Sequence, residues 1–307
     1  MSKKFIVAVD LGGTNLKIGI LDLKYNIRRK EVLSTRKFDR KEDLILAIES
    51  GIKSIIRATF LKQGSILGIG LGLPGPVDSK GGIVHFFPNI PGWREVNLKG
   101  LLEKRLKLPV FLDNDAKLMA LAEYKLGDAG SFRNVLCITL GTGVGGGLIL
   151  EKRLYRGEDN AAGEIGHLPI NEKGPRCNCG GVACLESYVG NNRIRQEAGK
   201  IFSRNISLEE LSALSKKGNQ KAINIWKKTG ERLGIALAGA VNLLNLDAIV
   251  IGGGVANAGK ILFEKLKETV RLRGMSVQSG RVKIFKARLG EDAGLIGAAI
   301  LVKEGAG

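Results

Sequence analysis

The residues best suited to chemistry are concentrated in the stretch CNCGGVACLE, residues 177–186, which holds three of the four cysteines of this 307-residue chain. One of the two histidines, His167, lies shortly before it. The N-terminal sequence MSKKFIVAVD lacks the apolar run of a secretory signal, so we expect a cytoplasmic protein. Because thiols stay reduced there, clustered cysteines indicate metal binding or catalysis rather than disulfides. Cys137, within VLCITL, is instead expected in the core.

The net charge of +18 raises the possibility of a nucleic-acid partner. However, Lys and Arg are spread through amphipathic segments such as 101–109 and 262–274. Aromatic residues make up only 5% of the chain and do not alternate with the basic runs, as a base-stacking surface requires. We therefore expect no nucleic-acid partner. We also expect no membrane association, because the chain has no run of about 18 apolar residues.

Two similar hairpins are expected to position some of the candidate functional residues. The segments 5–23 and 135–150 each read as strand, glycine turn and strand, and the turns carry the hydroxyls of Thr14 and Thr142. This repetition predicts a duplicated α/β architecture. Hydrophobic periodicity predicts the other elements. The expected helices are 40–63, 117–127, 229–245 and 294–306, and the expected strands are 66–78, 108–116 and 246–256.

The second turn, GTGVGG at 141–146, also satisfies the dinucleotide fingerprint G-x-G-x-x-G. That fingerprint requires a helix after the turn, whereas GLILEKRLYRG reads as a strand, which argues against an NAD-dependent enzyme. A third glycine turn follows the strand at 246–256. Three such turns favour backbone amides that hold phosphate groups, since only glycine lets the main chain approach that closely. Tight hairpins without a ligand are the alternative.

Together these motifs resemble the ROK family of sugar kinases and repressors, within the actin-like, hexokinase-type ATPase superfamily, and are closest to its glucokinases. DLGGTNLK (10–17) and LGTGVGGG (140–147) are similar to the family's phosphate motifs, and IGGGVA (251–256) to its adenosine motif. GEIGH (163–167) with CNCGGVACLE is similar to its zinc and sugar segment. Ala183 stands where the family usually has glycine, which concerns only the local geometry of the zinc loop.

The resemblance covers essentially the whole chain and implies an α/β fold of the actin-like ATPase type, a duplicated ribonuclease H-like fold with two lobes and a cleft between them. We expect a small lobe at 1–114, joined by the C-terminal helix 296–307. The large lobe, 115–295, would carry the zinc loop and the nucleotide site. The resemblance also implies a homo-oligomer, either a dimer or a tetramer.

By the same resemblance, a zinc ion has four ligands: His167, Cys177, Cys179 and Cys184. Four ligands fill a tetrahedral zinc and leave no open position, so the Zn²⁺ is expected to be structural. The alternative is a core histidine with inert buried thiols. A loop rich in Gly, Asn and Pro offers little core for them.

Asp115, in LDNDAK, is the expected general base. It follows a predicted strand where a helix begins, the usual place for a site in an α/β sheet. The resemblance places it beside the sugar's primary hydroxyl, which it would deprotonate for attack on the γ-phosphate of ATP. The alternative for Asp115 is an N-cap of the following helix. Asp113 and Asn114 are rivals for either role.

The resemblance assigns the remaining contacts residue by residue. Asp10 would orient Mg²⁺ through water. Lys17 is expected at the phosphates, although it could be an exposed strand residue. The sugar would contact Gly75, Asn89, Asn114, Asp115, Glu164, His167 and Glu186. The phosphates would contact Gly12, Gly13, Thr14, Lys17, Thr142 and Gly143, and the adenosine Gly253 and Gly254.

The implied activity is ATP-dependent phosphorylation of the 6-hydroxyl of a hexose, with glucose as the first choice. A kinase for fructose, N-acetylmannosamine or N-acetylglucosamine is the alternative within this class. A ROK transcriptional repressor is the alternative from another class. It would need a DNA-binding winged helix before the first phosphate motif, and that motif begins at residue 10.

Overall fold

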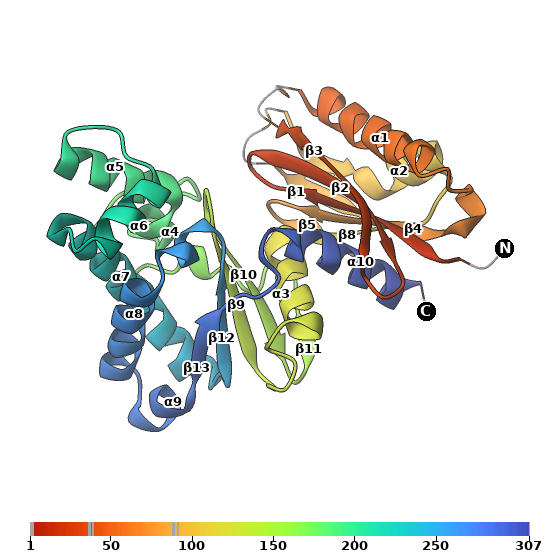
Figure 1. Ribbon diagram of the computed structural model, residues 1–307. Coiled ribbons are helices and arrows are strands. Elements are labelled where there is room, and N and C mark those ends of the chain that lie inside the picture. Colours follow the sequence, from red (N-terminus) through yellow and green to blue (C-terminus); the bar gives the residue numbers. More distant parts are fainter. Residues whose placement is uncertain (1–2, 36–37, 39, 88–89, 91, 307) are drawn as a thin grey trace. The chain divides into compact units, whose positions relative to one another are not determined.

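The computed structural model describes residues 3–35, 38, 40–87, 90 and 92–306, and forms two compact units (Figure 1). Unit 1 consists of Met1–Ala122, Arg156–Ala162 and Glu291–Gly307, and unit 2 of Glu123–Tyr155 and Gly163–Gly290. The expected small lobe ended at residue 114, but unit 1 extends further. It continues to Ala122 because helix α3 (Asp115–Leu126) packs its Leu118 against Gly72 of the sheet.

The centre of unit 1 is a five-stranded sheet in which the first three strands are antiparallel and the last two are parallel to β1. Helix α1 (Lys41–Ala58) covers one face, where Gly51 approaches Ile18. Helix α10 (Ala293–Gly305) covers the other face, and Gly70 leaves room for its backbone at Ala298. In spatial order the strands are β3 (Ile27–Ser34), β2 (Asn15–Asp22), β1 (Phe5–Leu11), β4 (Ile66–Leu73) and β8 (Val110–Asn114).

A small sheet lies between β4 and β8 in the chain and was not predicted from the sequence. Its strands are too short for a clear alternation of polar and apolar residues. They are β5 (Val77–Asp78), β6 (Ile83–Phe86) and β7 (Arg94–Asn97). Helix α2 (Leu98–Leu106) follows at once, and the side chain of Asn97 accepts a hydrogen bond from the Gly100 N–H at its start.

Unit 2 repeats the plan of unit 1. When its strands are numbered in chain order, its sheet has the same 3-2-1-4-5 arrangement, with the same antiparallel and parallel pairs. This confirms the predicted duplication. A strand, and not a helix, follows the turn 141–143, as expected. The strands are β11 (Arg153–Tyr155), β10 (Val144–Leu150), β9 (Val135–Leu140), β12 (Ala248–Gly252) and β13 (Lys283–Lys286).

Helices α7 (Gln220–Leu244) and α8 (Lys260–Arg273) form a core with the sheet of unit 2. Helix α7 begins at Gln220 rather than at 229, because Asn219 accepts a hydrogen bond from the Ala222 N–H and caps it earlier. Cys137 is fully buried in β9, as predicted. The other helices are α4 (Glu186–Val189), α5 (Asn191–Phe202), α6 (Leu208–Lys216) and α9 (Ser276–Arg281), with short 3-10 turns η2 (Gln63–Ser65), η3 (Ile165–His167), η4 (Gly254–Ala258) and η5 (Gly290–Asp292).

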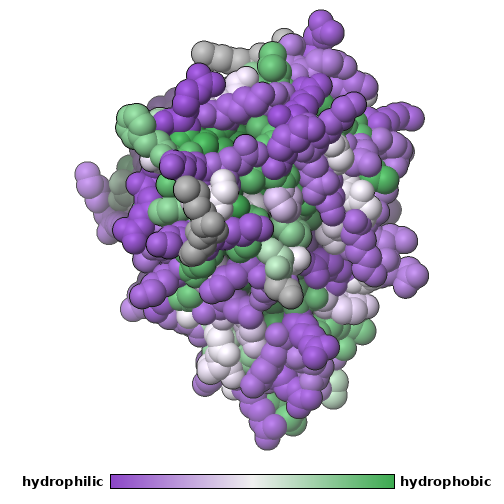
Figure 2. Space-filling view, turned by 90° about the vertical axis from the view of Figure 1, so that its right-hand side faces the viewer, coloured by the Kyte–Doolittle hydropathy of each residue, from purple (hydrophilic) through white to green (hydrophobic). Residues whose placement is uncertain are grey.

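Each unit has its own hydrophobic core. On the face seen in Figure 2, hydrophilic side chains cover most of the surface, and hydrophobic ones show between them. Among the described residues, no helix has the length and apolar character needed to cross a membrane.

Candidate active site

In unit 1, the turn between β1 and β2 brings a carboxylate and an amine together. Asp10 and Lys17 are paired across the two strands, and Lys17 Nζ lies 3.5 Å from Asp10 Oδ2. The same Nζ donates to the main-chain oxygen of Glu291 at 2.6 Å. Lys17 is therefore a partly buried member of this group and not a freely exposed strand residue. Gly13 and Thr14, at the tip of the turn, are exposed.

The Asp10 carboxylate is partly buried beside Lys17 and the start of helix α10. Burial raises the pKa of its carboxyl group above the ordinary value, while the charge of Lys17 acts in the opposite direction. Gly294, in the first turn of α10, lies so close that an added Cβ would be 2.4 Å from the Asp10 carboxyl carbon. A carboxylate at a helix N-terminus is favoured by the helix dipole. Mg²⁺ is usually bound by one or two carboxylates together with substrate phosphates, which fits this donor set.

The end of β8 gives Asn114 and Asp115 different local roles. Asn114 Oδ1 accepts hydrogen bonds from the N–H groups of Ala116 and Lys117, at 3.0 and 3.2 Å, so Asn114 caps helix α3. Its Nδ2 donates to the Gly75 carbonyl at 3.1 Å. Asp115 is partly buried in the first turn of the helix, and its Oδ1 accepts from Ala116 N at 2.8 Å. The cap role that competed for Asp115 is thus filled by Asn114.

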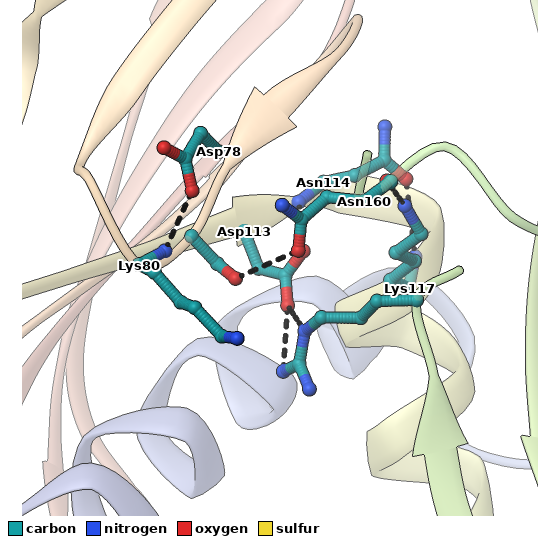
Figure 3. A network of polar contacts seen from close by, with 8 residues as sticks. Asp78, Lys80, Asp113, Asn114, Lys117 and Asn160 are labelled. Carbon is teal, nitrogen blue, oxygen red and sulfur yellow. Dashed lines mark hydrogen bonds and ion pairs between the residues drawn. The ribbon is translucent and has the colours of Figure 1, made fainter. Parts of the chain in front are cut away.

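Asp113 is the third polar residue at this strand end, and its side chain is fully buried. Its Oδ2 accepts from both Nε and a terminal nitrogen of Arg156 at 2.8 Å, and its Oδ1 accepts from Asn114 N at 2.8 Å. Next to it, Lys117 Nζ donates to the main-chain oxygen of Asn160 (Figure 3). Asp113 is therefore used in an ion pair, which removes it as a rival for the base.

In unit 2, the second expected phosphate turn, 141–143, lies against helix α4. Glu186 Oε2 accepts from the Val144 N–H at 2.8 Å. Gly143 leaves the room for this contact, because an added Cβ would lie 2.4 Å from the same oxygen. The first residue of α5, Asn191, donates its N–H to the Gly141 carbonyl at 2.9 Å. The expected phosphate turn and the residue that ends the cysteine loop are thus in direct contact.

Gly253, within the expected adenosine motif 251–256, has a conformation that requires glycine. Its φ is 84° and its ψ is 174°, a combination that L side chains avoid. An added Cβ would also lie 2.2 Å from the Leu140 carbonyl oxygen. The turn after β12 is therefore held directly against the end of β9, where the phosphate turn begins.

Gly253→Ala is expected to weaken ATP binding at least about 10-fold, because the turn must move away from β9 to admit the methyl group. Titration calorimetry with ATP measures this. Gly239→Ala in helix α7 is the matched control, since its Cβ would contact nothing within 4 Å. Unchanged ATP affinity in Gly253→Ala would count against a nucleotide role for this turn.

The four predicted zinc ligands form one cluster in unit 2. The ligand atoms of His167, Cys177, Cys179 and Cys184 all lie within 4.8 Å of one another. Cys179 Sγ is 3.7 Å from Cys184 Sγ, and Cys177 Sγ is 3.6 Å from His167 Nδ1. Tetrahedral zinc, with its usual bond lengths, requires about 3.8 Å between two sulfurs and about 3.6 Å between nitrogen and sulfur. These two distances therefore match those expected around a tetrahedral Zn²⁺.

Without a metal, ionisation of the Cys184 thiol is unfavourable. Burial, followed by the neighbouring thiols of Cys179 and Cys177, raises the pKa of Cys184 to about 12. A metal needs thiolates and supplies the positive charge that stabilises them. No other group of three or more His, Cys, Asp or Glu in the described part of the chain is placed to hold a metal.

His167 has its two ring nitrogens in different surroundings. Nδ1 faces Cys177, and Nε2 lies 3.9 Å from Glu164 Oε2. Glu164 is exposed and precedes the short 3-10 turn Ile165–His167. Gly163 before it has a φ of 95° and packs on the backbone of Gly146 in β10, and this contact fixes the position of the backbone next to Glu164. One ring nitrogen is thus available to zinc and the other faces a predicted sugar contact.

The predicted site residues fall into two sets by unit, and Asn89 lies outside the described residues. Sequence reasoning missed Arg156 and Asn160, because their partners are distant in the chain and the segment 156–162 carries no motif. A cavity of about 560 Å³ along β13 and α8 is lined by none of the predicted site residues. Unit 1 contains Asp10, Gly12, Gly13, Thr14, Lys17, Gly75, Asn114 and Asp115, and unit 2 contains Thr142, Gly143, Glu164, His167, Cys177, Cys179, Cys184, Glu186, Gly253 and Gly254.

Comparison with known proteins decides the family. The sequence model described as "ROK family" matches residues 6–305. The chain belongs to the ROK family. A glucokinase of Thermotoga maritima is 33% identical to this ROK protein over 99% of each chain. Among solved structures, a ROK hexokinase from Thermus thermophilus is 35% identical, with a TM-score of 0.81, and the match covers 99% of this chain and all of the other.

A ROK glucokinase from Streptomyces griseus, solved with glucose and AMPPNP, is 29% identical to this ROK protein. Its TM-score is 0.85, over 98% of this chain and 99% of that one. The ROK kinases have the actin-like ATPase fold, and the two sheets of equal strand order show the same fold here. A xylose repressor of Caldicellulosiruptor bescii is also similar, at 28% identity over 97% of this chain and 77% of the repressor.

Proposed function

We propose that glucose is the substrate of this enzyme, a sugar kinase that transfers the γ-phosphate of ATP to the 6-hydroxyl of the hexose. The observation that carries the proposal is the similarity over nearly the full chain to a glucokinase, combined with a partly buried Asp115 at the end of a parallel strand. The glucokinase of Streptomyces griseus was solved with glucose and the ATP analogue AMPPNP, which supports both substrates.

Asp115 would act as the general base that removes the proton of the 6-hydroxyl during attack on the γ-phosphate. Its own Oδ1 accepts from Ala116 N, so the carboxylate is oriented by the first turn of α3. Asn114 and Gly75 would contact the sugar from the same unit. The carbonyl of Gly75 is already bonded to Asn114 Nδ2, which fixes the spacing of the two residues.

Glu164, His167 and Glu186 would also bind sugar hydroxyls. Carboxylates suit this role because each can accept hydrogen bonds from two adjacent hydroxyls. One oxygen of Glu186 accepts from Val144 N, so the other is the one assigned to the sugar. Zn²⁺, held by His167 and the three cysteines, supplies a structural cross-link and takes no part in the transfer.

The nucleotide would bind to the glycine turns. Gly12, Gly13, Thr14, Lys17, Thr142 and Gly143 would contact the phosphates, and Gly253 and Gly254 the adenosine. Mg²⁺ bound with ATP neutralises phosphate charge, and Asp10 would orient it. A cytoplasmic location and a dimer or tetramer stay predictions.

A coupled ADP-release assay with glucose, fructose, N-acetylmannosamine and N-acetylglucosamine tests the substrate. We expect kcat/KM for glucose to exceed that for the other three by at least about 10-fold, because a site made of hydroxyl contacts discriminates against sugars that do not satisfy them. A higher kcat/KM for an N-acetylhexosamine than for glucose would overturn the assignment of glucose as the substrate, while the assignment as a sugar kinase would remain.

The similarity to a xylose repressor makes a sugar-sensing regulator the second candidate. The same assay separates the two functions when sugar binding is measured alongside it. Hexose binding by calorimetry without ADP release from any of the four sugars would favour the sensor. Turnover with any of them would favour the kinase.

A further inference from the structure

The segment Arg156–Ala162, here called the strap, follows β11 of unit 2 but packs as part of unit 1. Its contacts are polar and specific. Arg156 pairs with Asp113 at 2.8 Å, and Asn160 accepts from Lys117 through its main-chain oxygen and from Ser79 Oγ at 3.2 Å through its side chain (Figure 3). The strap ends directly before Gly163, which opens the motif GEIGH.

The pair at the first end of the strap involves a fully buried charge. The Asp113 side chain is 0% exposed and that of Arg156 is 31% exposed. Removing one partner of such a pair leaves an uncompensated charge in the interior, so the contact is strongly maintained. Because Asp113 also accepts from Asn114 N, Arg156 is connected through one residue to the turn that begins helix α3 at Asp115.

The other end of the strap holds two separate pieces of unit 1. Lys117 is 2% exposed and lies in the first turns of α3, two residues after Asp115. Ser79 follows the loop that contains Gly75. Asn160 itself has a φ of 57°, a left-handed conformation that asparagine tolerates better than most residues. The strap therefore contacts helix α3, which carries Asp115, and Ser79, which lies shortly after Gly75.

We propose that Arg156 and Asn160 are positioning residues for phosphoryl transfer. They touch no reacting atom. They act through Asp113, Lys117 and Ser79, which hold Asp115 and the loop that contains Gly75 in position. This inference rests on the proposed kinase function. It differs from simple stabilisation of the fold, because it requires the effect to fall on catalysis and on the sugar rather than equally on both substrates.

Loss of the strap contacts is expected to lower kcat by displacing Asp115. Catalytic groups act within a narrow range of positions, and a shift of about 1 Å costs on the order of 10²-fold in rate. Arg156→Ala is therefore expected to lower kcat by about 10- to 100-fold and to raise the KM for the hexose. The KM for ATP should change less than about 3-fold, because Arg156 and Asn160 are bonded to Asp113, Lys117 and Ser79, and none of these three is a predicted nucleotide residue.

Arg153→Ala is the matched control, since Arg153 is an exposed arginine in β11 shortly before the strap. Its kinetics should equal those of the wild type. The wild type and both variants are first compared by circular dichroism, and all assays are run below the melting temperature of the least stable. Unchanged kcat in folded Arg156→Ala would overturn the proposal.

Two further variants keep the test decisive if Arg156→Ala does not fold. Arg156→Lys keeps the charge but loses the two-pronged contact, and should recover at least about 3-fold of the lost kcat. Asn160→Gly keeps the left-handed backbone and removes only the bond to Ser79, so a loss of about 2- to 5-fold, mainly in the KM for the hexose, is expected. Equal changes in both substrates' KM would indicate a structural role alone. If the wild type phosphorylates no hexose, the proposed function fails before the strap is tested.

Discussion

Asp115→Asn is expected to lower kcat for hexose phosphorylation by 10²-fold or more, on the order of what a general base contributes. The substitution preserves the size of the side chain and its bond to the Ala116 N–H, and removes only the ability to take up a proton. The affinity for the hexose, measured by calorimetry, should change little, because amide oxygens accept hydrogen bonds from hydroxyls as carboxylates do.

The matched control is Asp43→Asn, which changes an exposed aspartate of helix α1 in the same unit and should leave kcat unchanged. A fully active Asp115→Asn enzyme would refute the assignment. A loss of hexose affinity as large as the loss of kcat would instead make Asp115 a binding residue, because that pattern marks interactions already made in the ground state.

Zinc removal is expected to cause the second large effect. Structural zinc contributes about 10–16 kcal/mol of apparent binding free energy in small zinc domains, and that energy is coupled to folding. A strong chelator should therefore lower the Tm and weaken hexose binding together, because His167 belongs to the metal cluster and its Nε2 faces Glu164. Elemental analysis of purified protein should find one zinc per chain.

Cys179→Ser and Cys137→Ala separate the metal from thiols in general. Cys179 lies in the cluster and is exposed, so its replacement should release zinc without opening a cavity. Cys137 is buried in β9, and its replacement should cost stability yet leave the zinc content unchanged. Zinc-free protein that remains folded and binds hexose normally would contradict a structural metal.

The elements that the sequence predicted well are those whose signal is local. Hydrophobic periodicity located α1, α3 and α10, and the repeated strand-turn-strand pattern predicted the two equivalent sheets. The grouping of His167 with the three cysteines was also predictable, because cysteine and histidine have few structural uses in a glycine-rich loop. The sequence left Asp113, Asn114 and Asp115 open as the cap of helix α3. Only the positions of the Asn114 side-chain atoms identified Asn114 as the cap.

The strap and the small sheet could not be predicted, for a physical reason. Arg156 lies 43 residues from Asp113 in the chain, and Asn160 lies 81 residues from Ser79. Such pairs form when the fold brings distant segments together, and neither hydropathy nor local spacing records them. The strands β5, β6 and β7 are too short to show a period.

The shared 3-2-1-4-5 strand order also bears on the protein's ancestry. Two halves with one plan are what an ancient gene duplication leaves behind, and the halves have since acquired different insertions: a small sheet between the fourth and fifth strands in one, and the cysteine loop between the third and fourth in the other. The residue after the fifth strand is Asp115 in the first half and Ala287 in the second. A carboxylate at this position is therefore found in one half alone, so two halves of one plan differ at the position proposed for the general base.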